Sequence, residues 1–213
     1  MVWLDIVFDP ICPWCFIGKA QLERALGGVP NPPFALRWQP FQLNPHMPPQ
    51  GMERALYLER KFGGKDKAAR AYKDIAAHAQ KAKVPINFAG ILRTPNTLNA
   101  HRLVHWAAIE GQATAMAEAL FQAYFTRGRD IGDSDVLVLL AQEVGLDGTV
   151  VRRLLRSDAD ADLLRAREAH FRTMGVHSVP TFILDNHYVI AGAQPVALWQ
   201  DVLAELHQQA TQG

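Results

Sequence analysis

The sequence contains only two cysteines among its 213 residues, Cys12 and Cys15. Two cysteines this close enclose almost no chain, so the disulfide framework typical of small secreted domains is excluded. A closed zinc site needs four ligands, and no second cysteine pair is present to complete one. Zinc binding and inert core cysteines are therefore the weaker alternatives. We expect local thiol chemistry and no metal site.

Long hydrophobic runs are also absent. No apolar stretch approaches the roughly 18 to 20 residues that a transmembrane helix needs, so we expect no membrane span. The first eight residues lack a basic segment and a small-residue cleavage site, and Asp5 interrupts their apolar run. The protein is therefore expected to be cytoplasmic, with no membrane partner.

The charge is balanced between the two signs. Lys and Arg total 22 against 21 Asp and Glu, which leaves a formal net charge of +1. Such a chain has no long-range field that would attract nucleic acid, so nucleic acid is not an expected partner. Hydrophobic residues make up 49% and charged residues 20%. These fractions are typical of globular proteins, so we expect a sizeable core and no extensive disorder.

The N-terminal part of the chain shows a strand, helix, strand pattern. Residues 2–8 are rich in β-branched and aromatic side chains and predict a buried strand. Residues 34–41 carry alternating apolar residues and predict a second, shorter strand. Between the strands, apolar residues at three- and four-residue spacing predict an amphipathic helix that follows the cysteines and ends at Gly27-Gly28.

The middle of the chain is predicted to be helical. Ala, Leu and charged residues dominate it, and single glycines mark helix ends. Asn96 and Ser134 are expected helix N-caps. The predicted elements from there to the C-terminus are helices near 52–62, 66–82, 97–110, 113–127, 134–144, 149–156 and 158–174, strands over 181–184 and 187–191, and a last helix after Pro195.

The two cysteines stand where the first predicted strand meets the first predicted helix. Free amides and the macrodipole at a helix N-terminus stabilise an anion, so we expect Cys12 to be the exposed, reactive thiolate. Cys15 lies one turn on, within disulfide reach, and is expected to be the buried, resolving thiol. Pro13 suits the first helical position, and we expect Pro13 and Trp14 to contact the substrate. Asp9 is expected to cap the helix or point away, and not to be the main proton acceptor, because a nearby carboxylate disfavours a thiolate.

A second feature lies far downstream of the cysteines. Pro180 begins a predicted strand, where a cis X-Pro bond or an edge position is expected. Together with the opening strand, cysteine pair and helix and with the closing elements, Pro180 completes the pattern of a thioredoxin fold. We therefore predict an α/β protein with a thioredoxin-like domain made of residues 1–43 and 170–213. An inserted all-helical domain of residues 44–169 separates its two parts.

Three separated segments resemble one known family in the same order. They are residues 9–18 (Asp-Pro-Ile-Cys-Pro-Trp-Cys-Phe-Ile-Gly), residues 95–102 (Pro-Asn-Thr-Leu-Asn-Ala-His-Arg), and residues 175–182 (Gly-Val-His-Ser-Val-Pro-Thr-Phe) with 192–195 (Gly-Ala-Gln-Pro). On these segments the chain resembles the DsbA-family thioredoxin-like oxidoreductases. The resemblance is to the FrnE-like branch, which is grouped with 2-hydroxychromene-2-carboxylate isomerases and kappa-class glutathione transferases.

The resemblance implies roles for the residues near both cysteines. Cys12 would attack the substrate, and Cys15 would resolve the mixed disulfide. The backbone of Val179, beside Pro180, would pair with an extended substrate.

The resemblance also suggests a ligand role for the start of the helix near residue 97. Asn96 and His101 would face the cysteine pair and bind a ligand carboxylate, because hydrogen-bonding groups are dense there and a helix start can hold an anion. The competing interpretation is that Asn96 only caps the helix and that Arg102 reaches solvent.

The predicted function is thiol–disulfide oxidoreduction without a permanently bound cofactor. The expected partners are a disulfide- or thiol-containing protein, a peptide or glutathione, and glutathione or another thiol would serve as co-substrate. The isomerase and transferase relatives have serine where this sequence has Cys12. A glutathione-dependent isomerase or transferase is therefore the alternative, and a non-enzymatic interaction module is a third interpretation.

Overall fold

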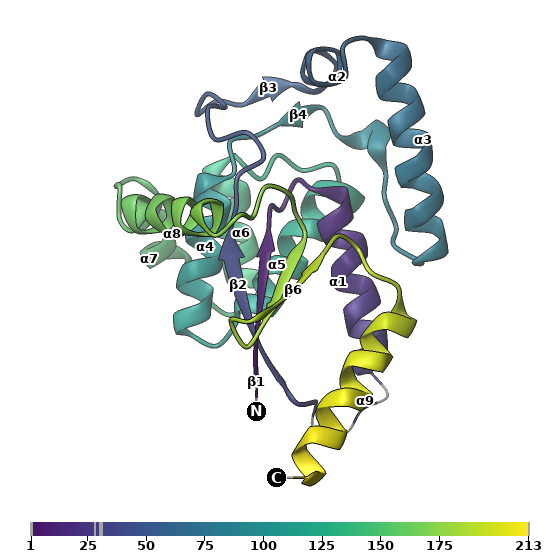
Figure 1. Cartoon of the computed structure of the whole chain (residues 1–213). Coiled ribbons are helices and arrows are strands. Elements are labelled where there is room, and N and C mark those ends of the chain that lie inside the picture. Colours follow the sequence, from purple (N-terminus) through teal and green to yellow (C-terminus); the bar gives the residue numbers. More distant parts are fainter. Residues whose placement is uncertain (1, 28, 30–31, 213) are drawn as a thin grey trace.

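The computed structural model of the protein describes residues 2–27, 29 and 32–212 (Figure 1). Gly28, the second residue of the predicted helix end, lies outside these ranges, as do Met1 and Gly213. Within them, no helix is both long enough and apolar enough to cross a bilayer. The helices are α1 (Pro13–Leu26), α2 (Arg54–Phe62), α3 (Lys65–Lys81), η1 (Phe88–Gly90), α4 (Leu98–Ile109), α5 (Ala113–Phe121), η2 (Gln122–Thr126), α6 (Ser134–Glu143), α7 (Gly148–Leu155), α8 (Ala161–Thr173) and α9 (Val196–Gln212). The strands are β1 (Val2–Phe8), β2 (Phe34–Pro40), β3 (Met52–Glu53), β4 (Arg93–Thr94), β5 (Thr181–Leu184) and β6 (Tyr188–Ala191).

A four-stranded sheet with the order β2-β1-β5-β6 forms the centre of the fold. β1 runs parallel to β2, with Val2 opposite Phe34, and antiparallel to β5, with Leu4 opposite Leu184. β6 pairs with β5 in the antiparallel direction. β1 therefore has one neighbour from each end of the chain. This pairing brings the cysteine segment after β1 beside the Pro180 segment before β5.

Helices cover the sheet on both sides. α1 packs against α9, whereas α4, α5 and α8 contact β2. Figure 1 shows α1 and α9 on one side of the sheet and α4, α7 and α8 on the other. α2 and α3 form a helical hairpin that extends beyond the end of the sheet, and α3 contacts α1. The α2–α3 hairpin thus lies over the end of α1 that carries the cysteines.

One hydrophobic core joins the sheet to the helices of the middle segment. Phe16 of α1 stacks on Phe121 of α5 with ring centroids 5.2 Å apart, and Phe8 of β1 meets the same ring at 5.9 Å. Buried Lys19 of α1 also forms an ion pair with Glu118 of α5. The predicted domain boundaries, after residues 43 and 169, stay a prediction, and these contacts join the segment before the first boundary to the predicted insertion.

The structure departs from the predicted elements in several places, and one is the N-cap of α4, which is Thr97 and not Asn96. β3 and β4 pair as two-residue strands, which are too short to show a periodic pattern in the sequence. The N-cap of α6 is Asp133 and not Ser134, because the Asp133 carboxylate accepts two N–H groups of the first turn. α8 begins at Ala161 and not near residue 158, since Asp160 adopts a left-handed φ of 60°.

Candidate active site

Cys12 occupies the N-cap position of α1. Its φ and ψ of −87° and 114° are extended, and Pro13 is the first residue of the helix. The Cys12 carbonyl accepts the N–H groups of Cys15 at 3.1 Å and of Phe16 at 3.3 Å. Strand β1 leads into this turn, so the end of the central strand and the start of the helix together fix both cysteines.

The Cys12 thiol contacts the loop before β5. Its Sγ donates a hydrogen bond to the carbonyl oxygen of Val179 at a distance of 3.5 Å. The Val179–Pro180 peptide bond is cis. Both cysteines are free thiols. Two segments that are far apart in the sequence therefore meet at the predicted nucleophile.

The two thiols differ in their access to a cavity. Both residues are buried, with 4% of Cys12 and 2% of Cys15 exposed. The expectation of an exposed Cys12 is thus wrong, because the α2–α3 hairpin and the Val179 loop enclose it. Cys12 nevertheless lines a cavity of about 460 Å³, and Cys15 does not. A substrate in this cavity would meet Cys12 first.

The surroundings of Cys15 disfavour its ionised form. Burial raises the pKa of Cys15 well above its ordinary value, and the adjacent Cys12 and the charge of Asp9 add to the rise. A thiol in this state is a poor nucleophile until a disulfide forms next to it. Cys15 therefore suits the resolving role.

Asp9 is a buried acid three residues before Cys12. Its carboxylate accepts the N–H groups of Leu43 at 2.7 Å and of Ile11 at 3.2 Å, so it does not cap α1, which was the first of the two alternatives expected for it. Burial raises the pKa of Asp9 to about 7, more than hydrogen bonds to its carboxylate lower it. The cap position belongs to Cys12 because the backbone between Asp9 and Pro13 turns before the helix begins.

The cavity lining combines residues from both ends of the chain with residues of the α2–α3 hairpin. The predicted contact residues Pro13, Trp14 and Val179 line it, and Pro180 lies directly behind. Trp14 also packs edge-to-face on His78 of α3, with ring centroids 5.0 Å apart. The sequence did not indicate the hairpin residues of the lining. Among them are Arg54, Tyr57, Lys61, Phe62 and Tyr72.

Asn96 and His101 lie away from this cavity. The Asn96 side chain donates to the Met47 carbonyl and accepts the N–H of Leu98, the first residue of α4. His101 is 3% exposed, its Nε2 donates to the Phe41 carbonyl at 3.1 Å, and burial lowers its pKa to about 4. Neither residue lines the cavity with Cys12. The structure thus contradicts their predicted ligand contacts, because both side chains form hydrogen bonds with backbone groups away from the cavity.

Arg102 does not reach solvent, contrary to the competing interpretation. Its guanidinium is buried and donates to the carbonyl groups of Leu154, Ser157 and Ala159. These carbonyls lie at and just after the C-terminal end of α7, where backbone acceptors lack helical partners. Arg102 therefore ties α4 to the end of α7.

Comparison with known proteins assigns the fold. Residues 3–204 match the model of the DSBA-like thioredoxin domain. The chain belongs to this family. The predicted α/β class and thioredoxin fold are confirmed with it, and so is the resemblance to DsbA-family proteins.

Several relatives of this DSBA-like protein share its full length. It is 31% identical over 205 residues to the uncharacterized protein YwbO of Bacillus subtilis, with 96% of each chain covered. A probable DsbA oxidoreductase of Streptomyces coelicolor is 30% identical, with 96% of this chain and 89% of that one covered and a TM-score of 0.85. The cytosolic disulfide reductase DsbM of Pseudomonas aeruginosa, solved with GSH, is 24% identical, with 97% and 99% covered and a TM-score of 0.69.

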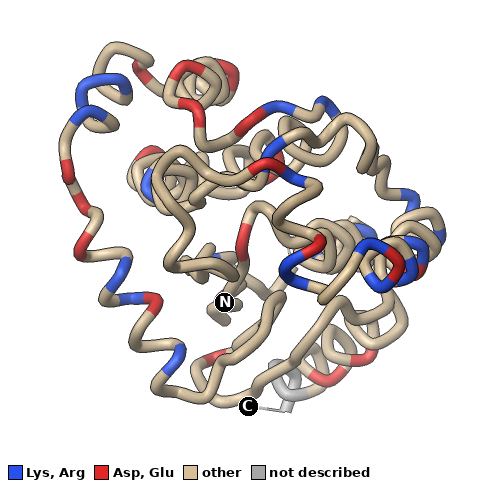
Figure 2. Tube along the Cα trace, turned by 90° about the horizontal axis from the view of Figure 1, so that it is seen from above, with Lys and Arg blue, Asp and Glu red and all other residues tan. Residues whose placement is uncertain are grey.

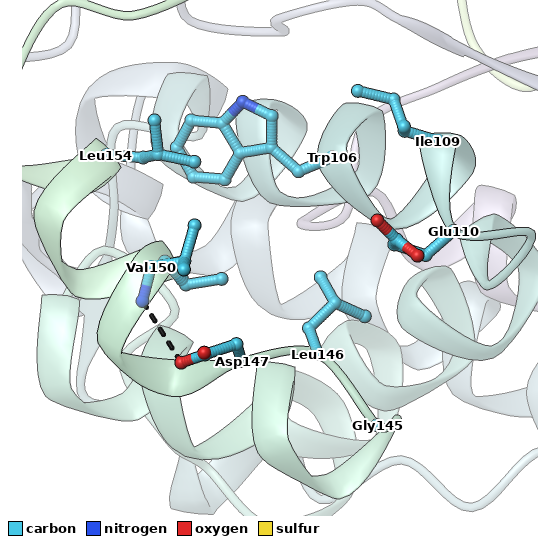
Figure 3. Close-up of a pocket in the computed structure, with 9 residues that line it drawn as sticks. Trp106, Ile109, Glu110, Gly145, Leu146, Asp147, Val150 and Leu154 are labelled. Atoms are coloured by element: carbon cyan, nitrogen blue, oxygen red, sulfur yellow. Dashed lines mark hydrogen bonds between the residues drawn. The ribbon is translucent and has the colours of Figure 1, made fainter.

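A second cavity of this DSBA-like chain, about 360 Å³ in volume, lies between α4 and α7 (Figure 3). Apolar side chains such as Trp106, Ile109 and Leu154 dominate its lining. Its Asp147 is occupied as the N-cap of α7, where it accepts the N–H of Val150. The lining contains no cysteine, and no cluster of metal ligands exists anywhere in the described ranges. The cavity beside Cys12 is therefore the candidate active site.

Proposed function

We propose that the protein is a thiol–disulfide oxidoreductase that uses Cys12 and Cys15 as its redox pair. One observation carries this proposal. Cys12 alone of the two thiols lines a cavity, while Cys15 lies buried one helical turn behind it with a raised pKa. This arrangement separates an attacking thiol from a resolving thiol.

The first step is attack on a substrate disulfide. The Cys12 thiol loses its proton, and the thiolate attacks one sulfur of the disulfide. A mixed disulfide forms between Cys12 and one half of the substrate, and the other half leaves as a thiolate that takes up a proton. Cys12 stands at the N-cap of α1, next to the first amides of the helix.

The second step releases the other half of the substrate. Cys15 loses its proton and attacks the Cys12 sulfur, which forms the Cys12–Cys15 disulfide and expels the second thiol. Two electrons have then passed from the cysteine pair to the substrate. Burial is the main obstacle to the ionisation of Cys15, and the charge of the buried acid Asp9 adds to it when Asp9 is ionised. A low-molecular-weight thiol would reduce the pair again, and a disulfide oxidant would drive the sequence in reverse.

We further infer that glutathione is the co-substrate thiol and that the protein works in the cytoplasm, without a permanently bound cofactor. The cytosolic disulfide reductase DsbM, whose fold is similar, was solved with GSH. The cavity of about 460 Å³ is within the range of small-molecule sites, about 300 to 1,000 Å³. The same size supports the alternative, a glutathione-dependent isomerase or transferase in which Cys12 activates a thiol without redox turnover. Peptide or protein disulfides remain further candidate substrates.

The decisive experiment traps the intermediate. Reduced Cys15→Ser protein mixed with glutathione disulfide should accumulate a mixed disulfide on Cys12, whereas the wild type should end with an internal disulfide. Intact-protein mass spectrometry distinguishes the two products, and Cys12→Ser is the matched control. Wild-type protein that never forms the internal disulfide, but does accelerate glutathione addition or isomerisation, would establish the alternative.

A further inference from the structure

Arg54 is a buried cation without a protein anion. It is 7% exposed and lines the cavity that contains Cys12. Its guanidinium donates to three hydroxyl groups, those of Thr94 at 3.2 Å, Tyr124 at 3.0 Å and Tyr72 at 2.5 Å. Across the part of the chain that the structure describes, no carboxylate forms an ion pair with it. Burying an unpaired charge is costly, so a counter-ion from outside the chain would stabilise this arrangement.

The hydroxyl partners of Arg54 do not supply that negative charge. Burial raises the pKa of Tyr72 and that of Tyr124, more than the charge of Arg54 lowers either. Both tyrosines therefore stay neutral at physiological pH. Three of the five N–H groups of the guanidinium are used by these contacts, which leaves two for a ligand.

The position of Arg54 in its helix also disfavours a positive charge. It is the first residue of α2, where the macrodipole is positive and acidic residues are preferred. The Glu53 carboxylate caps this helix end by accepting the N–H groups of Ala55 and Leu56, so the guanidinium is the group left for an added anion.

Lys61 adds a second positive charge to the same cavity. Its Nζ donates to the Tyr57 hydroxyl at 2.7 Å and forms no ion pair with any described carboxylate. Asp74 is the acid of the cavity lining and is exposed. Arg54 is buried, so the buried charge of the cavity lining is positive.

The whole α2–α3 hairpin is basic. Residues 54–81 contain eight Lys and Arg against three Asp and Glu, a net charge of +5 in a chain of +1. In Figure 2 blue segments lie on the side of the molecule where α3 stands in Figure 1, and others lie on the opposite side, where α7 and α8 stand. A cavity below such a hairpin attracts anions and repels cations.

We propose that Arg54 and Lys61 form an anion-binding subsite beside Cys12, and that the disulfide exchanged here is a small molecule that carries a carboxylate. This inference rests on the proposed function, because it concerns the substrate of the same cysteine pair. The guanidinium binds the carboxylate, and the substrate disulfide reaches across the cavity to Cys12. A carboxylate at Arg54 would hold the disulfide in place for attack.

The test uses three disulfides with the same two-carbon arms and different charges. They are 3,3′-dithiodipropionate, which is anionic, 2-hydroxyethyl disulfide, which is neutral, and cystamine, which is cationic. Reduced protein is mixed with each, and formation of the Cys12–Cys15 disulfide is followed by acid quench and mass spectrometry in a single turnover. Each rate is divided by the rate of the same disulfide with dithiothreitol. We expect the anionic disulfide to exceed the neutral one by about tenfold and cystamine by more.

Substitutions test which residues produce the charge preference. Lys61→Gln and Arg54→Gln should each lower the rate of the anionic disulfide about tenfold relative to that of the neutral disulfide. Arg54→Lys should restore part of the preference, which keeps the test valid if Arg54→Gln folds poorly. Lys81→Gln, at the far end of α3, is the matched control and should change neither rate.

The outcomes separate the two proposals. Equal normalised rates for the three disulfides in the wild type would overturn the anion subsite and leave the oxidoreductase function intact. A charge preference that keeps its wild-type size in Lys61→Gln and in Arg54→Gln, or in Arg54→Lys where Arg54→Gln does not fold, would also overturn the assignment. Failure to react with any disulfide would instead contradict the proposed function itself.

Discussion

The Cys12 thiol is hydrogen-bonded to the Val179 carbonyl, although the two residues are 167 positions apart in the chain. The thiol has a single S–H donor, so the bond exists only while Cys12 is protonated. When Cys12 ionises or enters a disulfide, the Val179 carbonyl loses its donor. The acceptor is then free to pair with an N–H group of an incoming substrate. The chemical state of the Cys12 sulfur thus determines whether the Val179 carbonyl is free to bind a substrate.

The first prediction concerns the order of alkylation. Cys12 should react with iodoacetamide before Cys15, because Cys12 lines the cavity whereas Cys15 is sealed behind it with a raised pKa. Mass-spectrometric peptide mapping after short exposure measures the order. In Cys12→Ser protein, Cys15 should stay almost unlabelled. Faster labelling of Cys15 would reverse the assigned roles.

The second prediction concerns Asp9 and pH. Its pKa is about 7 in the folded chain against an ordinary value of 3.8. Between these values only the folded state holds the proton, so this group's contribution to the free energy of unfolding falls as pH rises from about 4 to 7. Asp9→Asn cannot ionise and should escape the loss. The stability difference between variant and wild type should therefore shift in favour of the variant by roughly 2 to 3 kcal/mol between pH 5 and pH 8.

Urea unfolding at the two pH values measures this shift. Buried His101, whose pKa is lowered to about 4, contributes with the opposite sign, because its stabilisation is lost as pH falls below about 6.5. It is present in both proteins and cancels in the comparison. The same Asp9→Asn protein should keep a reactive Cys12, and loss of Cys12 alkylation would show that Asp9 is its base.

The third prediction concerns Gly18 in α1. A Cβ at this position would lie 3.1 Å from Cγ of Pro180 and 3.4 Å from the backbone of Ala193. Gly18→Ala should therefore overpack the contact between α1 and the Pro180 segment and lower the free energy of unfolding by about 1 to 3 kcal/mol. Chemical denaturation measures the change. Arg24→Ala, on the exposed side of the same helix, should stay within about 0.5 kcal/mol of the wild type. Equal stability of Gly18→Ala and wild type would show that the contact can relax.

The fourth prediction concerns Arg102. Arg102→Leu removes the donors of three backbone carbonyls near the end of α7 and should cost on the order of 3 kcal/mol. The loss should appear in thermal and urea unfolding. Arg102→Lys should recover part of it, because an ammonium can still donate to some of these acceptors. A Leu variant as stable as the wild type would mean that water replaces the guanidinium.

The sequence predicted the parts of the site that depend on local pattern. The strand, cysteine pair and helix at residues 2–26 show their order and periodicity directly, and the placement of Pro180 before a strand follows from the same logic. Residues that favour helix starts and ends also predicted most of the helices in the middle of the chain. These features depend on neighbours in the chain, so they can be read without knowing the tertiary structure.

The remaining parts depend on where helices point. Arg54 and Tyr72 reach Cys12 only because the α2–α3 hairpin folds back over α1, and no local periodicity encodes that placement. His101 sits on a helix with many polar groups, yet the side chain faces the core because α4 packs against the sheet through that side. One local signal for Arg54 did exist. A cation as the first residue of a helix opposes the macrodipole and indicates a tertiary or ligand partner.

The pairing of β1 between β2 and β5 also sets an order of events during translation. β2 is complete by residue 40, whereas β5 begins at residue 181. At about 5 to 20 residues per second, the ribosome needs roughly 7 to 30 seconds to make the intervening chain. During that interval one edge of β1 has no partner, and Cys12 has no Val179 beside it. When β5 emerges, it pairs with the free edge of β1 and brings Val179 beside Cys12. The nascent chain is then no longer exposed to strand addition or to unwanted mixed disulfides.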